Sequence, residues 1–166
     1  MKENETFTEK SHGSKNYAEL QKIIFAVEEV MKNTALLDNI KSEKELEQVM
    51  PILLASLGNY AQADRSYVLE MKPAMTDMLY MTHLWCKEGI SPVATEQQEL
   101  PLRNVPNWYP ILKQGGTIIV YDWNENRERY REEYEIFSEQ NIKSIILIPI
   151  TSAGIVVGYI GVDTPK

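Results

Sequence analysis

The sequence is poor in the residues that most enzymes and metal sites use. Its 166 residues include one cysteine, Cys86, and two histidines, His12 and His83. A single cysteine excludes a disulfide within the chain and a cysteine-based zinc site. Only His83 lies outside the polar N-terminal stretch, so no Ser/His/Asp set can be assembled, and no nucleophile elbow or glycine-rich phosphate loop is present. We find no active site and no metal site, and expect that the protein is not an enzyme.

Basic charge and long apolar runs are also scarce. The chain has 17 Lys and Arg against 24 Asp and Glu, a formal net charge of −7, and no basic cluster. Binding to nucleic acid needs a concentrated basic face. The longest apolar run, residues 145–150, is too short to cross a bilayer, and the polar N-terminus has no signal-peptide core. These absences predict a cytoplasmic protein that binds neither nucleic acid nor membranes.

The N-terminal segments divide into a tail and a helix. Residues 1–16 are polar and aperiodic, which predicts a disordered tail. Over residues 17–35 the apolar side chains recur at helical spacing with a heptad-like seam. The seam residues are Tyr17, Leu20, Ile24, Val27 and Met31. This helix either packs on its own domain or forms a linker and dimerisation helix, and barely two heptads do not decide between the two.

The periodicity of the rest of the chain alternates between helix and strand. Ser42 followed by Glu45 is typical of a capping box, and Pro51 predicts a bend in the helix that follows. Strands are expected next, then a Pro-containing irregular stretch and a mixed C-terminal part. The expected elements are a helix after Ser42, strands 65–71 and 78–87, irregular residues 88–107, a short helix 107–114, a strand 117–123, a helix 124–140, and a hairpin of strands 143–150 and 155–163.

This order of elements predicts an α+β fold. Two strands close in sequence form an antiparallel hairpin, and the last two strands are apolar on both faces, as expected for the covered middle of a sheet. We therefore expect a mostly antiparallel sheet with helices on one side and a layer of loop and helix on the other.

Four phrases, taken in order, resemble a GAF domain, the ligand-sensing module of bacterial signalling proteins. They are ADRSYVLE (63–70), HLWCKEGISP (83–92), LPLRNVPNWYPILKQGG (100–116) and QNIKSIILIPITSAGIVVGYIGVD (140–163). The resemblance is to GAF domains upstream of diguanylate cyclases or histidine kinases. It implies a GAF-like α/β/α sandwich over residues 36–166 with a central five- or six-stranded antiparallel sheet, a pocket on one face, and a homodimer formed through the flanking helices, here residues 17–35.

Eight residues are candidates for binding a ligand in such a pocket. Small-molecule pockets are mostly apolar with a few polar groups, which favours the aromatic side chains of the expected pocket layer. The aromatic candidates are Trp85, Trp108, Tyr109, Tyr121 and Trp123, and the polar candidates are His83, Arg103 and Asp122. The alternative is that these aromatic rings fill the space and form a solid core. The ligand and any cofactor are unknown.

Three specialised activities of GAF relatives find little support in the residues. Cys86 lies in an expected strand and is followed by Lys87, whereas bilin-binding GAF domains usually carry a cysteine next to a histidine on a helix. A lone thiol cannot complete the disulfide cycle of GAF methionine sulfoxide reductases. The motif of cyclic-nucleotide GAF domains is not matched. Cys86 is interpreted as a structural thiol.

The resemblance therefore implies a non-catalytic sensory domain of a bacterial signal-transduction protein. It would bind a small molecule and relay the signal through its flanking helices to a C-terminal output domain absent from this chain. The alternative is a ligand-free module for dimerisation and signal relay.

Overall fold

The computed structural model describes residues 24, 28, 31–33, 35–38, 40–72, 77–92 and 98–165. The chain divides into two compact units, Met1–Val49 and Met50–Lys166. The expected tail, residues 1–16, lies outside the described residues, as does most of the expected helix at 17–35. The described residues 24, 28, 31–33 and 35–37 are helical.

Helix α2 (Glu43–Tyr60) begins at the expected cap. The Ser42 carbonyl accepts a hydrogen bond from the Leu46 backbone N–H at 3.1 Å, and the Ser42 hydroxyl accepts one from the Glu45 N–H at 3.3 Å. Pro51 lies inside the helix, which continues to Tyr60. Pro51 therefore does not end the helix.

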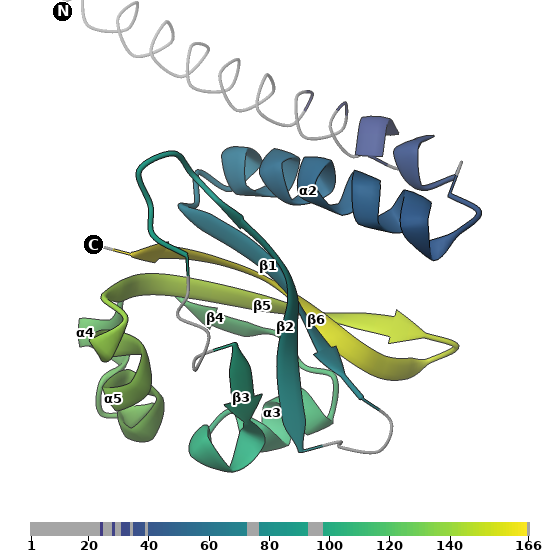
Figure 1. Ribbon diagram of the computed structural model, residues 1–166. Coiled ribbons are helices and arrows are strands. Elements are labelled where there is room, and N and C mark those ends of the chain that lie inside the picture. Colours follow the sequence, from purple (N-terminus) through teal and green to yellow (C-terminus); the bar gives the residue numbers. More distant parts are fainter. Residues whose placement is uncertain are drawn as a thin grey trace, which may run out of the picture. The chain divides into compact units, whose positions relative to one another are not determined.

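Six strands form one antiparallel sheet in the order β3-β2-β1-β6-β5-β4 (Figure 1). The strands are β1 (Arg65–Met71), β2 (Met78–Cys86), β3 (Glu99–Pro101), β4 (Ile118–Val120), β5 (Ile142–Ser152) and β6 (Ile155–Pro165). The fold class is confirmed, with the last hairpin supplying an interior strand, β6, between β1 and β5. The hairpin turns at Ala153 and Gly154, whose φ angles of 50° and 78° are those of a two-residue primed turn.

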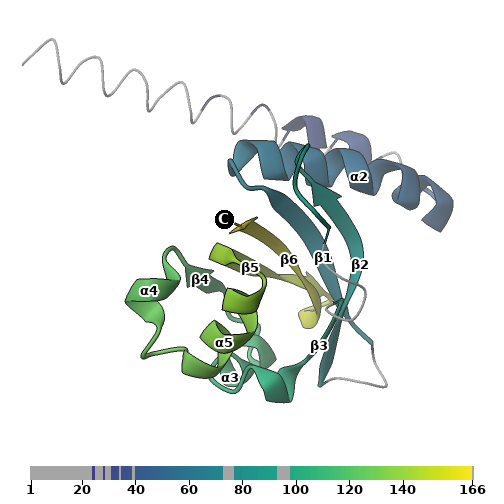
Figure 2. The same cartoon turned by 60° about the vertical axis from the view of Figure 1, so that its left-hand side comes forward.

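The two faces of the sheet are covered differently. On one face, the Met50–Tyr60 part of α2 packs closely: the Ser66 hydroxyl donates to the Leu54 carbonyl at 2.6 Å, and a Cβ on Gly58 would lie 2.2 Å from the Trp85 ring. Gly58 therefore allows helix and sheet to approach. The opposite face carries helices α3 (Tyr109–Lys113), α4 (Trp123–Asn126) and α5 (Arg131–Glu139), which gather together in Figure 2.

An aromatic cluster holds the second layer together. Trp108 is fully buried, with ring centroids 5.7 Å from Trp123 and 5.0 Å from Phe137 in stacked geometry, and 6.1 Å from Tyr130 edge-on. Aromatic pairs at these separations stabilise beyond their buried area. The rings occupy the centre of the layer formed by α3, α4 and α5.

Two segments differ from the sequence expectation. The irregular stretch 88–107 contains strand β3 and the short 3-10 helix η2 (Leu102–Asn104). The helix expected over 124–140 is two helices, α4 and α5, separated at Tyr130, whose φ of −128° and ψ of 55° are not helical. Tyr130 is buried and contacts Trp108, so packing of this ring into the core accompanies the break.

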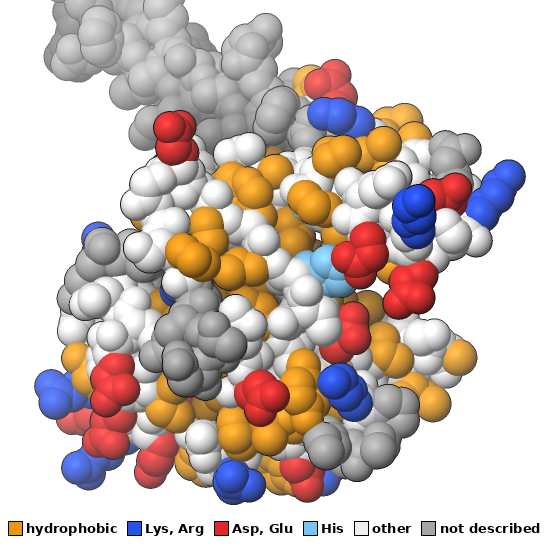
Figure 3. All heavy atoms as spheres, viewed as in Figure 1, with side chains coloured by type: hydrophobic (Ala, Val, Ile, Leu, Met, Phe, Trp, Pro, Cys, Tyr) orange, Lys and Arg blue, Asp and Glu red, His pale blue; other side chains and the backbone are white. Residues whose placement is uncertain are grey.

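Charged side chains are distributed over the surface. Figure 3 shows acidic and basic side chains interspersed on the displayed face. Among the described residues, no helix is long and apolar enough to span a membrane. Likewise, no cluster of three or more His, Cys, Asp or Glu in the described part of the chain is arranged to hold a metal ion.

Candidate functional site

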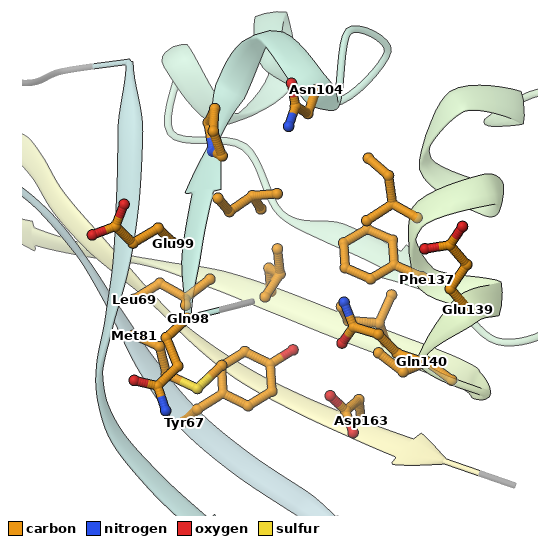
Figure 4. Close-up of a pocket in the computed structure, with 16 residues that line it drawn as sticks. Tyr67, Leu69, Met81, Gln98, Glu99, Asn104, Phe137, Glu139, Gln140 and Asp163 are labelled. Carbon is orange, nitrogen blue, oxygen red and sulfur yellow. The ribbon is translucent and has the colours of Figure 1, made fainter. Parts of the chain in front are cut away.

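A cavity of about 230 Å³ lies between the sheet and the end of α5 (Figure 4). Its apolar lining comes from β1, β2, β3, β5 and α5, and its polar lining comes from residues in and around β3, from the end of α5 and from β6. The described lining residues are Tyr67, Leu69, Met81, Gln98, Glu99, Leu100, Pro101, Asn104, Ile136, Phe137, Glu139, Gln140, Ile142, Ile145, Leu147 and Asp163. Segments far apart in the sequence thus build one mostly apolar cavity with polar groups, the usual composition of a small-molecule site.

A buried ion pair joins two central strands beside the cavity. Arg65 and Asp163 are directly paired between β1 and β6, and their side chains are only 5% and 2% exposed. The Arg65 Nε donates to Asp163 Oδ1 at 2.7 Å and Nη2 donates to Oδ2 at 3.1 Å. This two-pronged geometry is the one in which a guanidinium best compensates a carboxylate. The Asp163 charge is therefore neutralised within the protein.

Tyr67 lines the cavity and contacts the Arg65–Asp163 ion pair. Its hydroxyl donates to the Asp163 carboxylate, toward which it points in Figure 4. A Cβ on Gly161 would lie 2.3 Å from the Tyr67 ring, so Gly161 provides the space in which the ring lies across β6. Burial, and then the Asp163 carboxylate, raise the pKa of Tyr67 well above its ordinary value. Burial also raises the pKa of Asp163, and this effect outweighs the opposing influence of Arg65.

The raised pKa of Tyr67 predicts alkaline destabilisation. Above about pH 10 the unfolded chain releases the Tyr67 proton while the folded chain retains it, so the free energy of unfolding falls as pH rises. Its slope contribution is at most about 1.4 kcal/mol per pH unit. Urea unfolding at a series of alkaline pH values should show a shallower slope for Tyr67→Phe than for the wild type. The exposed Tyr121→Phe is the control, and equal slopes for Tyr67→Phe and the wild type would contradict the assignment.

A buried carboxylate of α5 binds the loop that precedes α3. Glu133 in the first turn of α5 is fully buried and accepts hydrogen bonds from the backbone N–H groups of Asn107 at 2.8 Å and Trp108 at 3.1 Å. The Tyr159 hydroxyl of β6 donates to the Leu112 carbonyl of α3. These bonds fix α3 and α5 against the sheet, and with them the α5 side of the cavity.

The structure does not bring the eight predicted site residues together. None of them is among the described residues that line the cavity. Tyr121, Asp122 and Trp123 line a second hollow beside α4, where the Asp122 carboxylate accepts from the Asn124 N–H at 2.7 Å and caps that helix. Trp123 also belongs to the buried aromatic cluster.

The other five predicted residues lie in three further places. Arg103 and Tyr109 line a third hollow, where the Tyr109 hydroxyl donates to Asp77 Oδ1 at 3.1 Å. Trp108 is at the centre of the aromatic cluster. His83 and Trp85 lie on the α2 side of the sheet.

A β-bulge determines the position of His83 and Trp85. Between β1 and β2 the pairing shifts from Leu69 with Met81 to Val68 with His83, so that Thr82 is an additional residue. Strict alternation from Met81 would direct residues 83 and 85 to the cavity side, and the bulge reverses this. The prediction that these residues bind a ligand is therefore not supported by their position, because they face away from the cavity.

The residues that do form the cavity's polar part were not identified from the sequence. Arg65 is the first residue of RSYVLEM and Asp163 is the last residue of IVVGYIGVD, so each is a charge at the end of a mostly apolar segment. Opposite charges at the ends of two antiparallel strands are a signal of cross-strand pairing. Glu99 and Glu139 carry no comparable signal, because they lie in a short strand and at the end of a charged helix.

Comparison with models of known protein families identifies the family of this chain. A sequence model of the GAF domain matches residues 45–166. The chain belongs to the GAF domain family. It is thus a sensory domain of the class that the four sequence phrases resemble, and GAF domains are generally non-catalytic. A search among curated proteins returned no match to the sequence.

Solved structures share the GAF fold at low sequence identity. The phycocyanobilin-bound GAF domain of a cyanobacterial phytochrome has a TM-score of 0.67 at 13% identity, over 84% of this chain and 79% of that chain. A photosensory core module of Stigmatella aurantiaca phytochrome has a TM-score of 0.65 at 9% identity, over 87% of this chain and 32% of that chain. A domain from a two-component sensor histidine kinase protein of Sinorhizobium meliloti has a TM-score of 0.52 at 16% identity, over 76% and 75%. At such identities the likeness concerns the fold.

Proposed function

We propose that this GAF domain is the cytoplasmic, non-catalytic sensor of a bacterial signal-transduction protein and binds a small molecule in the cavity between the sheet and α5. The observation that carries the proposal is the cavity itself: an apolar interior with polar groups, assembled from five strands and the end of α5. The output domain would be a diguanylate cyclase or a histidine kinase outside this chain.

Binding of a ligand in the cavity could also change the structure at the end of β6, through Asp163. Asp163 lines the cavity and lies near the end of β6, and its backbone carbonyl accepts from the Asp64 N–H at 3.0 Å. A ligand that favours one arrangement of Asp163 would therefore bias the end of β6 and the start of β1. Such coupling requires only that the ligand bind two arrangements with different affinity.

A bilin is not the ligand that we propose. Cys86 is not among the described lining residues, and burial raises the pKa of its thiol, which reduces its nucleophilic thiolate form. The cavity of about 230 Å³ is also below the range of about 300–1,000 Å³ that holds drug-sized ligands. The proposed ligand is smaller than the bilins named in the related structures.

The binding proposal predicts that filling the cavity abolishes ligand-induced stabilisation. Met81→Trp and Leu100→Trp place an indole in the cavity from β2 and from β3, whereas Met78→Trp makes the same exchange on β2 outside the lining. Thermal unfolding with a library of small metabolites should yield compounds that raise the Tm of the wild type and of Met78→Trp, but not of the two cavity variants. Compounds that stabilise all four chains equally bind elsewhere and would contradict the proposal.

A second candidate, a ligand-free module for dimerisation and relay, is favoured by the aromatic cluster. Trp108, Trp123 and Phe137 stack closely, which is the packing expected under the alternative that the aromatic rings form a solid core. Both candidate functions include a homodimer formed through the helix that the sequence predicts over residues 17–35. Light scattering of the chain without residues 1–35 should then give a monomer, with the full chain as the control, and a truncated chain that remains dimeric would exclude that helix as the seam.

A further inference from the structure

Two of the residues that line the cavity are both polar and buried. Tyr67 and Asp163 are almost completely buried. The other polar lining residues are partly or largely exposed, namely Gln98, Glu99, Asn104, Glu139 and Gln140. No Lys, Arg or His is among the described lining residues. A ligand inside the apolar interior therefore meets its buried polar contacts at Tyr67 and Asp163.

The strand register directs both of these side chains to the cavity face of the sheet. Asp163 of β6 is directly opposite Ile145 of β5, which lines the cavity. Tyr67 of β1 is directly opposite Gly161, and Gly161 is in turn opposite the lining residue Leu147. Directly opposite residues share a face of the sheet. In Figure 4 the Tyr67 hydroxyl and the Asp163 carboxylate lie together at one end of the cavity.

These two side chains offer hydrogen-bond acceptors and no donor. The Asp163 carboxylate accepts from Arg65 Nε at 2.7 Å, from Arg65 Nη2 at 3.1 Å and from the Tyr67 hydroxyl. A carboxylate has about four lone-pair sites, so about one stays open. The single hydroxyl proton of Tyr67 is used in its bond to Asp163, and its oxygen can otherwise only accept. The buried polar part of the cavity thus lacks the donors that a ligand carboxylate or phosphate needs.

The charge of Asp163 is balanced within the protein. Arg65 lies 2.7 Å away, and the two side chains are 5% and 2% exposed. A ligand ammonium would lose its hydration here without gaining an uncompensated counter-ion, and a ligand carboxylate would face acceptor oxygens. The buried end of the cavity therefore favours an uncharged group that has a proton to donate.

The apolar part of the cavity has room for an aromatic ring. The rings of Tyr67 and Phe137 line it together with Leu69, Met81 and Leu147. An apolar cavity of about 150 Å³ binds benzene. The volume of about 230 Å³ found here holds such a ring with a small polar group.

We infer that the ligand of this cavity is a small, uncharged aromatic molecule with an N–H or O–H group that donates a hydrogen bond to the Asp163 carboxylate. The inference rests on the proposed function and specifies its ligand class. Indoles and phenols are examples of this class. Arg65 is a positioning residue, because it holds the carboxylate by two hydrogen bonds and leaves an acceptor site for the ligand.

Indole and benzofuran test the donor, since they share one bicyclic shape and differ in an N–H group and an oxygen atom. NMR titration of the full chain should show indole binding about five- to twentyfold more tightly, the effect of one net hydrogen bond to a charged acceptor. Intermolecular NOEs should place the indole N–H next to Ile145, which is opposite Asp163. Equal affinities of the two probes, or an N–H placed at Leu100 of β3, beyond β1 and β2, overturn the inference.

Benzyl alcohol, benzylammonium and benzoate test the charge, because they carry the same ring and end in a neutral, a cationic and an anionic group. Benzyl alcohol should bind at least about fivefold more tightly than either ion, since neither ion finds an uncompensated partner at the buried end. An ion that binds as tightly as the alcohol overturns the inference.

Variants of the buried ion pair locate the acceptor. Arg65→Met/Asp163→Leu removes both charges, and the preference for indole over benzofuran should fall to within about twofold. Arg131→Met/Glu135→Leu makes the same exchange at an exposed pair outside the lining and should retain the preference.

Tyr67→Phe gives a second test of the acceptor, which decides the matter even where the double variant does not fold. It removes the hydroxyl that donates to Asp163 and so opens a further acceptor site on the carboxylate. The preference for indole should therefore be retained or increased. Loss of the preference in Tyr67→Phe, or its retention in Arg65→Met/Asp163→Leu, overturns the inference.

The failure of the ligand class and the failure of the proposed function give different results. If metabolites stabilise the wild type but not Met81→Trp, and indole binds no more tightly than benzofuran, the cavity is a ligand site and the assignment of the donor is wrong. If neither the metabolite library nor any of the probes distinguishes the wild type from Met81→Trp, the proposed function is also wrong. If indole is preferred and Met81→Trp abolishes its binding, both are supported.

Discussion

Replacing Arg65 by methionine is expected to lower the free energy of unfolding by about 3–5 kcal/mol at neutral pH. Arg65 supplies both hydrogen bonds of a two-pronged pair to Asp163, and both side chains are almost completely buried. Removing the guanidinium leaves a buried carboxylate without a counter-ion, which costs much more than the net stabilisation that the intact pair provides. Urea unfolding of the variant and the wild type measures the difference.

Two further variants separate an unpaired charge from a general loss of packing. The double variant Arg65→Met/Asp163→Leu removes both charges and should recover most of the lost stability. Arg131→Met breaks the exposed pair with Glu135, whose atoms are 3.9 Å apart, and should change stability little. A double variant no more stable than Arg65→Met alone would show that the buried charge is not the cause.

Replacing Trp108 by alanine is expected to cost about 3–5 kcal/mol as well. The ring is fully buried and contacts Trp123, Phe137 and Tyr130, so its removal leaves a cavity in the middle of the aromatic cluster. Denaturant unfolding measures the loss. If Trp108 instead bordered open space for a ligand, its neighbours would relax and the loss would be far smaller.

Two control experiments accompany the unfolding measurement on Trp108→Ala. Trp108→Phe keeps a ring in the stack and removes an indole N–H that has no hydrogen-bond partner, so it should cost much less than the alanine exchange. Indole added to Trp108→Ala should restore part of the stability, because empty apolar cavities bind apolar ligands of matching size. Equal losses for the phenylalanine and alanine variants would contradict the role of the stack.

Most of the fold could be predicted because its elements have strong periodicity. Strand β1 agrees with the expected 65–71, and β2 ends one residue before the expected 87. The last hairpin has long apolar strands and a turn at Ala153 and Gly154 within the expected TSAG. In each case local pattern and tertiary packing favour the same structure.

Elements that depend on tertiary contacts were missed. Strand β3 has three residues and exists because Leu100 pairs with Leu79 of β2, a contact that no local pattern indicates. The break between α4 and α5 contains neither glycine nor proline. It occurs where Trp123 and Tyr130 both turn into the aromatic core.

None of the eight residues predicted to bind a ligand is among the described residues that line the cavity, and their role in binding stays a prediction. Aromatic side chains suit an apolar pocket, but they also bury large areas in a protein core, and Trp108 and Trp123 lie in the core here. His83 and Trp85 lie on the face of the sheet away from the cavity because β2 contains one additional residue, and the alternation of side chains along the sequence does not indicate this residue. The cavity is lined by the rings of Tyr67 and Phe137 and by smaller apolar side chains that strand pairing brings together, such as Leu69 with Met81.

The most direct test of ligand binding in the cavity is to map where a small molecule binds, using amide NMR spectra of the full chain titrated with a metabolite that raises the Tm of the wild type but not that of Met81→Trp. The perturbed amides are expected to cluster around the cavity, at Tyr67, Met81, Gln98, Phe137 and Gln140, and Met81→Trp is expected to remove the perturbation. Perturbations confined to the hollow beside α4, around Tyr121 and Lys143, or none at all, would contradict the claim that this cavity is the sensory site.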